Sequence, residues 1–338
     1  MGVCIDDACW CCSRCAGSVP SRPAAVFRRV TLRWNGRRLP AWVATLALAC
    51  THKSPPRYVQ ISVGDHACAR RSDGRVVCWG ANRFGATGAR EGDMEPAVVS
   101  FIRDATDVAA GHDVSCAVVG NGNVECWGFV WSADPRDRRQ RIPGVHDAVR
   151  VLLAGRRACA LAADGAAICW GPAEGAALVP REWPPAPDPA MRGAIEMSGR
   201  EDLYCARIGD AFRCRRASSP EPFEVRTEGV AITFPAYQLC TLAGDAVTCD
   251  GEKAKSDSPL RELVASGNTV CGVGSNGSVQ CVDTALLPRY WRFDPVQDLP
   301  PPAKLAGGEH GFCALTGDSR VFCWDPRIKT AREAPRPP

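Results

Sequence analysis

Cysteine is the residue type in this sequence whose number and spacing could do chemistry. The chain has 338 residues and 20 cysteines, and the 14 that follow position 60 fall into pairs. Partners stand nine or ten residues apart, and no cysteine in this stretch is left over. The pairs are Cys68 with Cys78, Cys116 with Cys126, Cys159 with Cys169, Cys205 with Cys214, Cys240 with Cys249, Cys271 with Cys281 and Cys313 with Cys323. Such thiols could form disulfides, which rarely persist in a reducing cytosol, or bind metal.

Each pair brackets a sequence typical of a β-hairpin turn. Ten-spaced pairs surround three-residue loops such as Ser72-Asp73-Gly74, with Ser319 replacing the third-position glycine in the last unit. Nine-spaced pairs surround Gly209-Asp210 and Gly244-Asp245, which suit two-residue turns. In both types the cysteines are the fourth residue pair from the loop, a non-hydrogen-bonded site with Cα atoms roughly 4.5 Å apart. Structural zinc ligands usually stand two to four residues apart. We therefore predict seven cross-strand disulfides, with zinc as the alternative.

A tryptophan follows the second cysteine in four of the units. The first unit reads Cys68-Ala69, a turn, and then Val76-Val77-Cys78-Trp79-Gly80, which is the apolar alternation of a strand pair. Neighbouring residues of a strand point to opposite faces of the sheet. We expect these side chains to fill the space between adjacent sheets: Trp79, Trp127, Trp170 and Trp324.

These units resemble the regulator-of-chromosome-condensation repeat, in the disulfide-bearing form of exported bacterial proteins. The resemblance includes Trp79-Gly80-x-Asn82-x-x-Gly85-x-x-Gly88 and covers roughly residues 58–326. It is strong in units one to three and seven, whereas Cys214-Arg215, Cys249-Asp250 and Cys281-Val282 lack the Trp-Gly. Seven units of roughly 40 residues predict an all-β, seven-bladed β-propeller with one disulfide hairpin per blade.

Details of the ring also follow from the spacing. The unit between Cys240 and Cys271 is short, so we expect only three good strands there. We expect one closing blade to combine both ends of the chain, with Tyr58–Val63 beside strands from Lys304 onward. The predicted propeller spans residues 58–330, and residues 331–338 form a disordered, proline-rich tail.

The N-terminal 49 residues have the composition of an export signal. A basic stretch and the apolar run Leu39–Ala49 precede Cys50, which resembles a bacterial lipobox with Cys50 as the acylated residue. The alternative is a buried strand with an incidental cysteine. Residues 50–57 are predicted to be a tether. Cysteines 9, 12 and 15 have metal-ligand spacing, but a metal site upstream of an export signal makes little physical sense. We therefore expect translation to start near Val26, Val30 or Leu32, which would leave residues 1–27 largely untranslated.

The formal net charge of +4 is unevenly distributed. Seven arginines and two aspartates give residues 1–49 a charge of +5, which leaves −1 for the rest of the chain. A nearly neutral body has no electrostatic surface for DNA or RNA. We therefore expect no nucleic-acid partner, and membrane contact only through a lipid on Cys50.

The sequence has no motif typical of an active site. His66, His112 and His310 each precede the first cysteine of their units, which favours a structural role in capping turns or bonding backbone over metal binding. No Ser-His-Asp arrangement, P-loop or His-Glu-x-x-His appears. We predict no catalytic, cofactor-binding or metal-ligating residue and no cofactor.

Three functions remain as hypotheses. The first is a monomeric, non-enzymatic, exported propeller, secreted or held in the cell envelope as a lipoprotein, whose loops bind a protein or glycan. Aromatic residues outside the repeat are candidate contact or gap-filling residues: Trp131, Trp183, Tyr290 and Trp291. The second is an exported hydrolase or lyase, which a His–carboxylate pair in the central funnel would favour. The third is guanine-nucleotide exchange, which only the family resemblance implies.

Overall fold

The computed structural model describes residues 56–130, 138–155, 157–171, 184–200, 203–216, 219–233, 238–286 and 288–334. The chain divides into two units, Met1–Lys53 and Ser54–Pro338, and all described residues belong to the second. The predicted export signal, the lipidation site Cys50 and most of the tether therefore lie outside the described residues. Within the described residues, no helix is long and apolar enough to cross a membrane.

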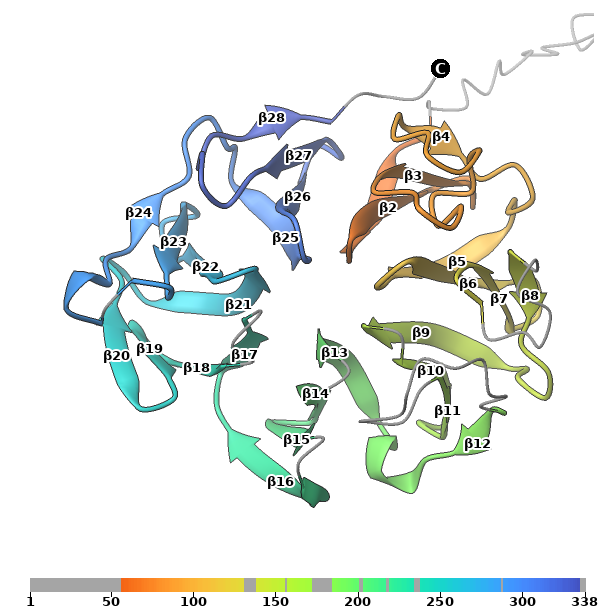
Figure 1. The fold of residues 1–338 in the computed structure, drawn as a ribbon, viewed down its shortest axis with the longest axis horizontal. Coiled ribbons are helices and arrows are strands. Elements are labelled where there is room, and N and C mark those ends of the chain that lie inside the picture. The colour runs from red at the N-terminus through yellow and green to blue at the C-terminus, as the bar shows by residue number, and fades with distance from the viewer. Residues whose placement is uncertain are drawn as a thin grey trace, which may run out of the picture. The chain divides into compact units, whose positions relative to one another are not determined.

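The second unit is a seven-bladed β-propeller, as predicted. Seven antiparallel sheets of four strands each stand around a central axis (Figure 1). In every sheet, neighbours in the chain are neighbours in space, so each blade is a simple meander. The described helices are two single turns of 3-10 helix, η1 (Pro189–Met191) and η2 (Pro288–Tyr290).

The strands of the first four blades, each from the innermost to the outermost, have the following bounds. Blade 1 is β1 (Tyr58–Val63), β2 (His66–Arg71), β3 (Val76–Gly80) and β4 (Ala97–Val98). Blade 2 is β5 (Ala105–Ala110), β6 (Val114–Val119), β7 (Asn123–Gly128) and β8 (Arg139–Arg141). Blade 3 is β9 (Ala148–Ala154), β10 (Arg157–Ala162), β11 (Ala167–Trp170) and β12 (Ala186–Pro187). Blade 4 is β13 (Ala194–Arg200), β14 (Leu203–Ile208), β15 (Ala211–Arg216) and β16 (Ser219–Arg226).

The remaining three blades follow the same plan. Blade 5 is β17 (Gly229–Ile232), β18 (Leu239–Ala243), β19 (Ala246–Cys249) and β20 (Glu252–Lys255). Blade 6 is β21 (Leu260–Ser266), β22 (Thr269–Gly274), β23 (Val279–Asp283) and β24 (Asp294–Pro295). Blade 7 is β25 (Pro302–Gly307), β26 (Phe312–Thr316), β27 (Val321–Trp324) and β28 (Arg332–Glu333).

All seven predicted disulfides are present, one between the two middle strands of each blade. In chain order, Cys68 is bonded to Cys78, Cys116 to Cys126, Cys159 to Cys169, Cys205 to Cys214, Cys240 to Cys249, Cys271 to Cys281 and Cys313 to Cys323. The partners are direct cross-strand neighbours in every hairpin, with Cα atoms 4.0–4.1 Å apart. This is the close spacing of a non-hydrogen-bonded pair, as the turn lengths predicted.

The disulfides are part of the core, and two cysteines show the range of their burial. Cys169 in blade 3 is 5% exposed and packs with the apolar cluster between blades 3 and 4. Cys323 in blade 7 is only partly buried, whereas the other paired cysteines are buried. In the turn of that same hairpin, Ser319 adopts the positive φ of 68° that glycine supplies in the other three-residue loops. Blade 7 therefore keeps the same turn conformation with serine in place of glycine.

The tryptophans fill the space between blades, and each covers the disulfide of the preceding blade. Trp127 of blade 2 packs with Cys68 and Cys78 of blade 1, and Trp170 of blade 3 packs with the disulfide of blade 2. Trp324 likewise covers the disulfide of blade 6. Trp79 packs against the blade 7 cluster, which includes Cys313 and Cys323, but stays partly exposed.

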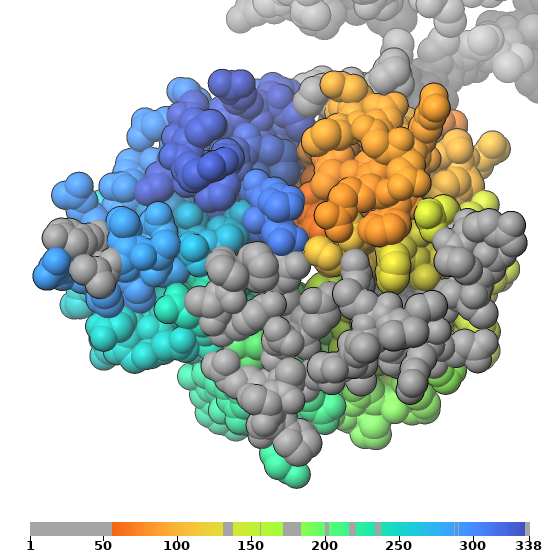
Figure 2. Space-filling view, viewed as in Figure 1, coloured from red at the N-terminus to blue at the C-terminus, as the bar shows by residue number. Residues whose placement is uncertain are grey.

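Three details of the ring differ from the sequence-based prediction. Blade 5 is complete, because a two-residue turn at Asp250 and Gly251, both with positive φ, joins β19 directly to β20. Residues Arg332–Glu333 form β28 and pair with β27, so the propeller extends past residue 330 into the predicted tail. Among the described residues, no blade combines strands from both ends of the chain. Instead, β1 packs against β25 and β26, and blades 7 and 1 lie side by side in Figure 2.

Candidate functional site

The seven inner strands surround a channel of about 920 Å³ along the axis of the ring. Because strands alternate in direction, the turn from the first to the second strand and the loop from the third to the fourth lie at the same end of every blade. We call this end of the ring the loop face. The disulfide hairpins turn at the opposite end, which we call the hairpin face.

Polar side chains of the inner strands connect blades 1 to 4 inside the channel. A β-bulge or similar register shift recurs near the start of the inner strand in six blades. Gln60 donates to Asp107 Oδ1 at 2.6 Å, and Asp107 Oδ2 accepts from the Val151 amide of blade 3 at 2.7 Å. Arg150 in turn donates to the carbonyl of Ile195 in blade 4. Hydrogen bonds therefore link the wall of the channel from blade 1 to blade 4.

Backbone hydrogen bonds form a second connection at the loop face, from blade 7 through blades 1 and 2 to blade 3. The Glu309 amide donates to the Gly64 carbonyl at 2.9 Å, and the Asp65 amide donates to the Gly111 carbonyl at 3.2 Å. The His112 amide donates to the Gly155 carbonyl at 2.8 Å. We call this series the glycine ladder. It fixes Asp65, His112 and Glu309 at the mouth of the channel, directly after Gly64, Gly111 and Gly308.

Only glycine allows so close an approach of the backbones. A Cβ on Gly64 would lie 2.2 Å from the Gly111 carbonyl oxygen, and a Cβ on Gly308 would lie 2.0 Å from the Gly64 oxygen. Real Cβ atoms do not come under 3.0 Å from such an atom, so any larger residue must push the blades apart.

The ladder brings Asp65, His112 and Glu309 together from blades 1, 2 and 7. His112 Nδ1 lies 2.7 Å from Asp65 Oδ2 and 3.3 Å from Glu309 Oε2. One ligand atom from each of the three residues lies within 4.8 Å of the others. The side chain of Asp65 is 8% exposed, that of His112 20% and that of Glu309 14%. The cluster therefore lines the channel but is largely removed from solvent.

Two carboxylates beside one imidazole make this cluster electrostatically unusual. Burial raises the pKa of Asp65 to about 6, and the nearby Glu309 adds to the rise, whereas His112 opposes it. A carboxyl group with such a pKa beside a histidine is typical of functional sites.

Asp113 lies on the other side of the His112 ring. Its Oδ2 is 3.4 Å from His112 Nε2 and 3.3 Å from the Arg83 guanidinium. Asp113 is 3% exposed and has a φ of 59°, a left-handed conformation that aspartate tolerates better than most residues. The ring of His112 is thus flanked by carboxylates at both nitrogens.

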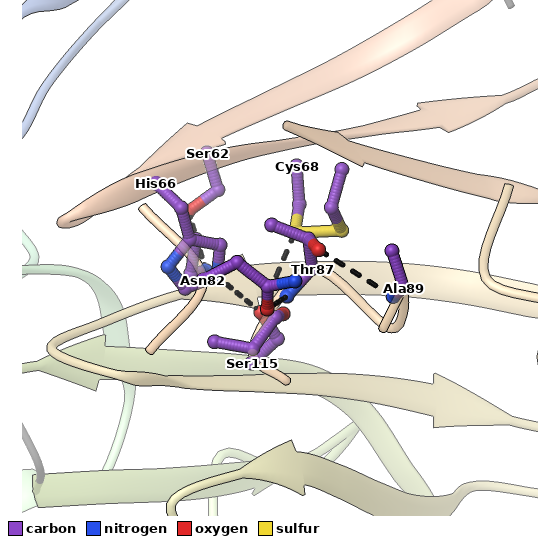
Figure 3. The surroundings of a disulfide bond; sticks show 10 residues. Ser62, His66, Cys68, Asn82, Thr87, Ala89 and Ser115 are labelled. Carbon is purple, nitrogen blue, oxygen red and sulfur yellow. Dashed lines mark hydrogen bonds between the residues drawn. A yellow bond between two sulfur atoms is a disulfide. The ribbon is translucent and has the colours of Figure 1, made fainter. Parts of the chain in front are cut away.

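The three histidines that sequence analysis grouped together have three different environments. His66 is fully buried, and its Nε2 lies 2.5 Å from Ser115 Oγ of blade 2, beside Cys68 (Figure 3). Because Ser115 Oγ donates to the Ala86 carbonyl at 2.9 Å, His66 Nε2 is the donor to Ser115. Burial lowers the pKa of His66 to about 4, which keeps it neutral. A structural role is confirmed for His66, but its partner is a side chain.

His112 and His310 do not share that role. His112 belongs to the cluster described above, and His310 is exposed. The expected structural role is therefore supported for His66, whereas for His112 and His310 it stays a prediction. The His66–Ser115 pair is not a nucleophile and base, because Ser115 is fully buried. Among the described residues, every cysteine is part of a disulfide.

The repeat motif of the first unit shapes a long loop on the loop face. Asn82 is 3% exposed and donates to the carbonyls of Arg90 and Asp93 at 2.8 and 2.9 Å, and its Oδ1 accepts from the Thr87 amide at 3.1 Å (Figure 3). Gly85 and Gly88 have φ of 76° and 72°, which the turns of this loop require. The Asn-x-x-Gly-x-x-Gly motif therefore stabilises the conformation of the loop between β3 and β4.

That loop carries an aromatic and arginine patch beside the cluster. Phe84 meets Phe129 of blade 2 edge to face, with ring centroids 5.3 Å apart. The guanidinium carbons of Arg83 and Arg138 lie 5.9 and 5.6 Å from the centre of the Phe84 ring. We call these four residues the arginine–phenylalanine patch.

Of the aromatic residues outside the repeat that sequence analysis proposed, Trp291 has a described side chain. Trp291 packs against the apolar cluster of blades 5 and 6, and its Nε1 donates to the Leu286 carbonyl at 2.8 Å, so it fills a gap between blades. Trp131, Trp183 and the side chain of Tyr290 lie outside the described residues.

Comparison with known proteins agrees with the repeat. Residues 58–86 match the family described as regulator of chromosome condensation (RCC1) repeat, which confirms the resemblance in the first unit. No curated protein matches the chain.

Several solved structures are similar to this one. Yeast RCC1 (Prp20) bound to Kap60 has 15% identity over 79% of this chain and 70% of that chain, with a TM-score of 0.47. Human WBSCR16 has 14% identity over 84% and 83%, with a TM-score of 0.47. The CRINKLY WD40 ectodomain of the Arabidopsis thaliana receptor kinase ACR4 has 16% identity over 82% and 99%, with a TM-score of 0.46. The fold of the present chain rests on its own strand topology.

Proposed function

We propose that this disulfide-linked propeller, whose first blade is an RCC1-type repeat, is an exported binding protein that holds a protein partner on its loop face. The observation that carries the proposal is the arginine–phenylalanine patch, which a rigid ring presents beside the mouth of the channel. Arginine and aromatic side chains are enriched where proteins bind one another.

The disulfides support an extracytoplasmic location. Seven hairpins each carry a disulfide, and such bonds persist in oxidising compartments. Export and acylation at Cys50 rest on the sequence of residues 28–50. Intact mass of the native protein, before and after reduction and alkylation, tests this part, since it reveals the true N-terminus, the number of disulfides and any acyl chain.

The patch favours a protein over a glycan. Sugar binding commonly uses an open aromatic face for stacking. Here, guanidinium groups of Arg83 and Arg138 lie over the Phe84 ring and Phe129 meets it at an angle of 71°. Arg83 is 69% exposed and can contact carboxylates or backbone carbonyls of a protein surface.

Cross-linking in the producing cells, followed by mass spectrometry and binding measurements with the purified partner, tests the proposal. We expect cross-links to map to the loop face and Phe84→Ala to weaken binding at least tenfold. Arg75→Ala is the matched control, because Arg75 is exposed beside the turn between β2 and β3 on the hairpin face. Cross-links confined to the hairpin face, equal affinity of both variants, or binding of a glycan alone would refute it.

A second candidate function is hydrolysis or lyase chemistry in the channel. The specific observation in its favour is the pair His112–Asp65, at 2.7 Å, because a histidine and carboxylate so placed can act in proton transfer. Activity against a panel of chromogenic esters and glycosides tests it: His112→Ala should abolish turnover, and Phe84→Ala should leave it unchanged. Guanine-nucleotide exchange gains no support from any described residue.

A further inference from the structure

We propose that Asp65, His112 and Glu309 bind a first-row divalent metal ion, such as Zn²⁺, at the mouth of the channel on the loop face. This site adjoins the arginine–phenylalanine patch and shares Arg83 with it, since Arg83 pairs with Asp113 behind His112, but its test does not require the proposed partner. Each ligand comes from a different blade, so the ion would bridge blades 7, 1 and 2.

The donor set fits such an ion. Zinc binds imidazole nitrogen at about 2.0 Å and carboxylate oxygen at about 2.0–2.2 Å, which separates neighbouring tetrahedral ligands by about 3.3 Å. His112 Nδ1 and Glu309 Oε2 already lie 3.3 Å apart, and Asp65 Oδ2 at 2.7 Å from the same nitrogen needs only a small shift. Three protein ligands leave a fourth position open toward the channel, as in catalytic zinc sites.

A second observation points to a metal: the residues behind His112 form the usual support of a ligating histidine. With Nδ1 on the metal, Nε2–H faces Asp113 Oδ2 at 3.4 Å, and Arg83 lies 3.3 Å from the same carboxylate oxygen. Histidines that bind metal commonly donate their second N–H to a carboxylate, which fixes the tautomer and the ring orientation. Asp113 is 3% exposed, so this partner is held in place.

Charge balance favours the same conclusion. Asp65, Glu309 and Asp113 carry three negative charges, and Arg83 neutralises one of them. The remaining carboxylates lie where little water screens them, and a divalent cation at this position would balance their charge.

The glycine ladder organises the ligands in advance. The amide of each ligand residue donates to the carbonyl of a ladder glycine in the adjacent blade. The backbone is thus fixed before any ion binds, so ion binding has to order only the side chains. The imidazole also distinguishes the site from one for Ca²⁺, which takes six to eight oxygen ligands.

The test is zinc titration of the full-length oxidised protein. Chelator treatment removes metal, and alkylation blocks unpaired thiols, since cysteines 4, 9, 11, 12, 15 and 50 could bind zinc themselves. We expect one Zn²⁺ per chain with a micromolar or tighter Kd. His112→Ala and Glu309→Gln should each weaken binding about 100-fold, and Asp113→Asn about 10-fold. Asp164→Asn is the control, a 66% exposed carboxylate on the hairpin face, and it should leave the Kd unchanged.

Co²⁺ supplies a readout that does not depend on affinity alone. The Co²⁺ protein should show visible absorption bands of a four- or five-coordinate nitrogen and oxygen site, without the intense near-ultraviolet band of thiolate ligands. The bands should disappear in Glu309→Gln, and circular dichroism of that variant should match the parent, which excludes unfolding as the cause. No stoichiometric Zn²⁺ binding by the parent, unchanged binding by the variants, or tighter binding of Ca²⁺ than Zn²⁺ would overturn the proposal.

Discussion

Blades 7, 1, 2 and 3 differ from blades 4, 5 and 6 in how adjacent sheets are joined. In the first group, a tryptophan after the second cysteine covers the preceding disulfide. In the second group, the same position holds Arg215, Asp250 or Val282. Tyr204 instead covers the disulfide of blade 3, and Val282 packs with that of blade 5. Different residues therefore solve the same packing problem.

The two groups also differ in the backbone contacts between blades. The glycine ladder runs through blades 7, 1, 2 and 3, and all three proposed metal ligands belong to it. In blade 6, a Cβ on Gly267 would meet nothing within 4 Å. The disulfide hairpin is thus common to every blade. A close backbone approach also occurs between blades 6 and 7, where a Cβ on Gly307 would lie 2.4 Å from the Ala265 carbonyl oxygen, so the feature that accompanies the cluster is the series of backbone hydrogen bonds. We infer that the disulfide hairpin stabilises each blade, and that the glycine ladder positions the residues of the cluster.

The largest expected effect is the loss of a covering tryptophan. Trp127→Ala should lower the free energy of unfolding by about 3–5 kcal/mol, because Trp127 is 1% exposed and its removal leaves a cavity over the Cys68–Cys78 disulfide. Val282→Ala, in the other group, should cost about 2 kcal/mol, since less apolar surface is lost. Denaturant titration of both variants measures the difference. Equal losses would mean that the tryptophans are not the main contact between their blades.

The ladder should be the next most sensitive feature. Gly308→Ala places a Cβ 2.0 Å from the Gly64 oxygen at the junction of blades 7 and 1, and should cost about 2–3 kcal/mol by overpacking. Gly317→Ala is the matched control in the same blade, because its Cβ would meet nothing within 4 Å. Thermal unfolding of the two proteins compares them. Similar Tm values would show that the ladder does not hold the ring closed.

Removal of a disulfide should affect both groups alike. Replacing Cys116 and Cys126 together by alanine should cost about 2 kcal/mol, and so should replacing Cys240 and Cys249, because the closed loops differ by one residue. Denaturant midpoints under non-reducing conditions test this equality. A much larger loss in one group would show that the disulfide has a different role there.

The smallest effect should be a change in pH dependence. Burial raises the pKa of Asp107, against the opposing effects of the Val151 amide, Gln60, Arg150 and Arg70. A carboxyl group whose pKa is higher in the folded state binds more protons when folded, so its contribution to stability falls as pH rises through that pKa. Asp107→Asn should therefore flatten the decline in stability above about pH 4. Parallel stability curves for parent and variant from pH 3 to pH 7 would contradict this origin.

Much of the fold could be predicted because its signals are local. The nine- and ten-residue spacings and the turn residues determine which strands pair and in which register, and all seven disulfides follow from them. The errors concern features that depend on distant partners. Arg332–Glu333 is a strand only because β27 provides an edge, and blade 5 has four strands because its outer turn needs only two residues.

The cluster was not predicted, because its residues come from three blades. His112 and Glu309 are 197 residues apart in the chain. His66, His112 and His310 all lie shortly before the first cysteine of their units, which favoured one common role. The signal that distinguishes the cluster is a preceding glycine, because Gly64, Gly111 and Gly308 stand directly before Asp65, His112 and Glu309. Repeat symmetry then places them at equivalent positions of adjacent blades.

The placement of every disulfide within one hairpin affects how the protein can mature. A cysteine meets its own partner nine or ten residues away, whereas the shortest step to another pair is the 22 residues from Cys249 to Cys271. Closing the shorter loop costs less chain entropy, and the tight turn already brings the correct sulfurs together. Each hairpin can therefore be oxidised independently of the rest of the chain, with few mispaired intermediates for an isomerase to repair.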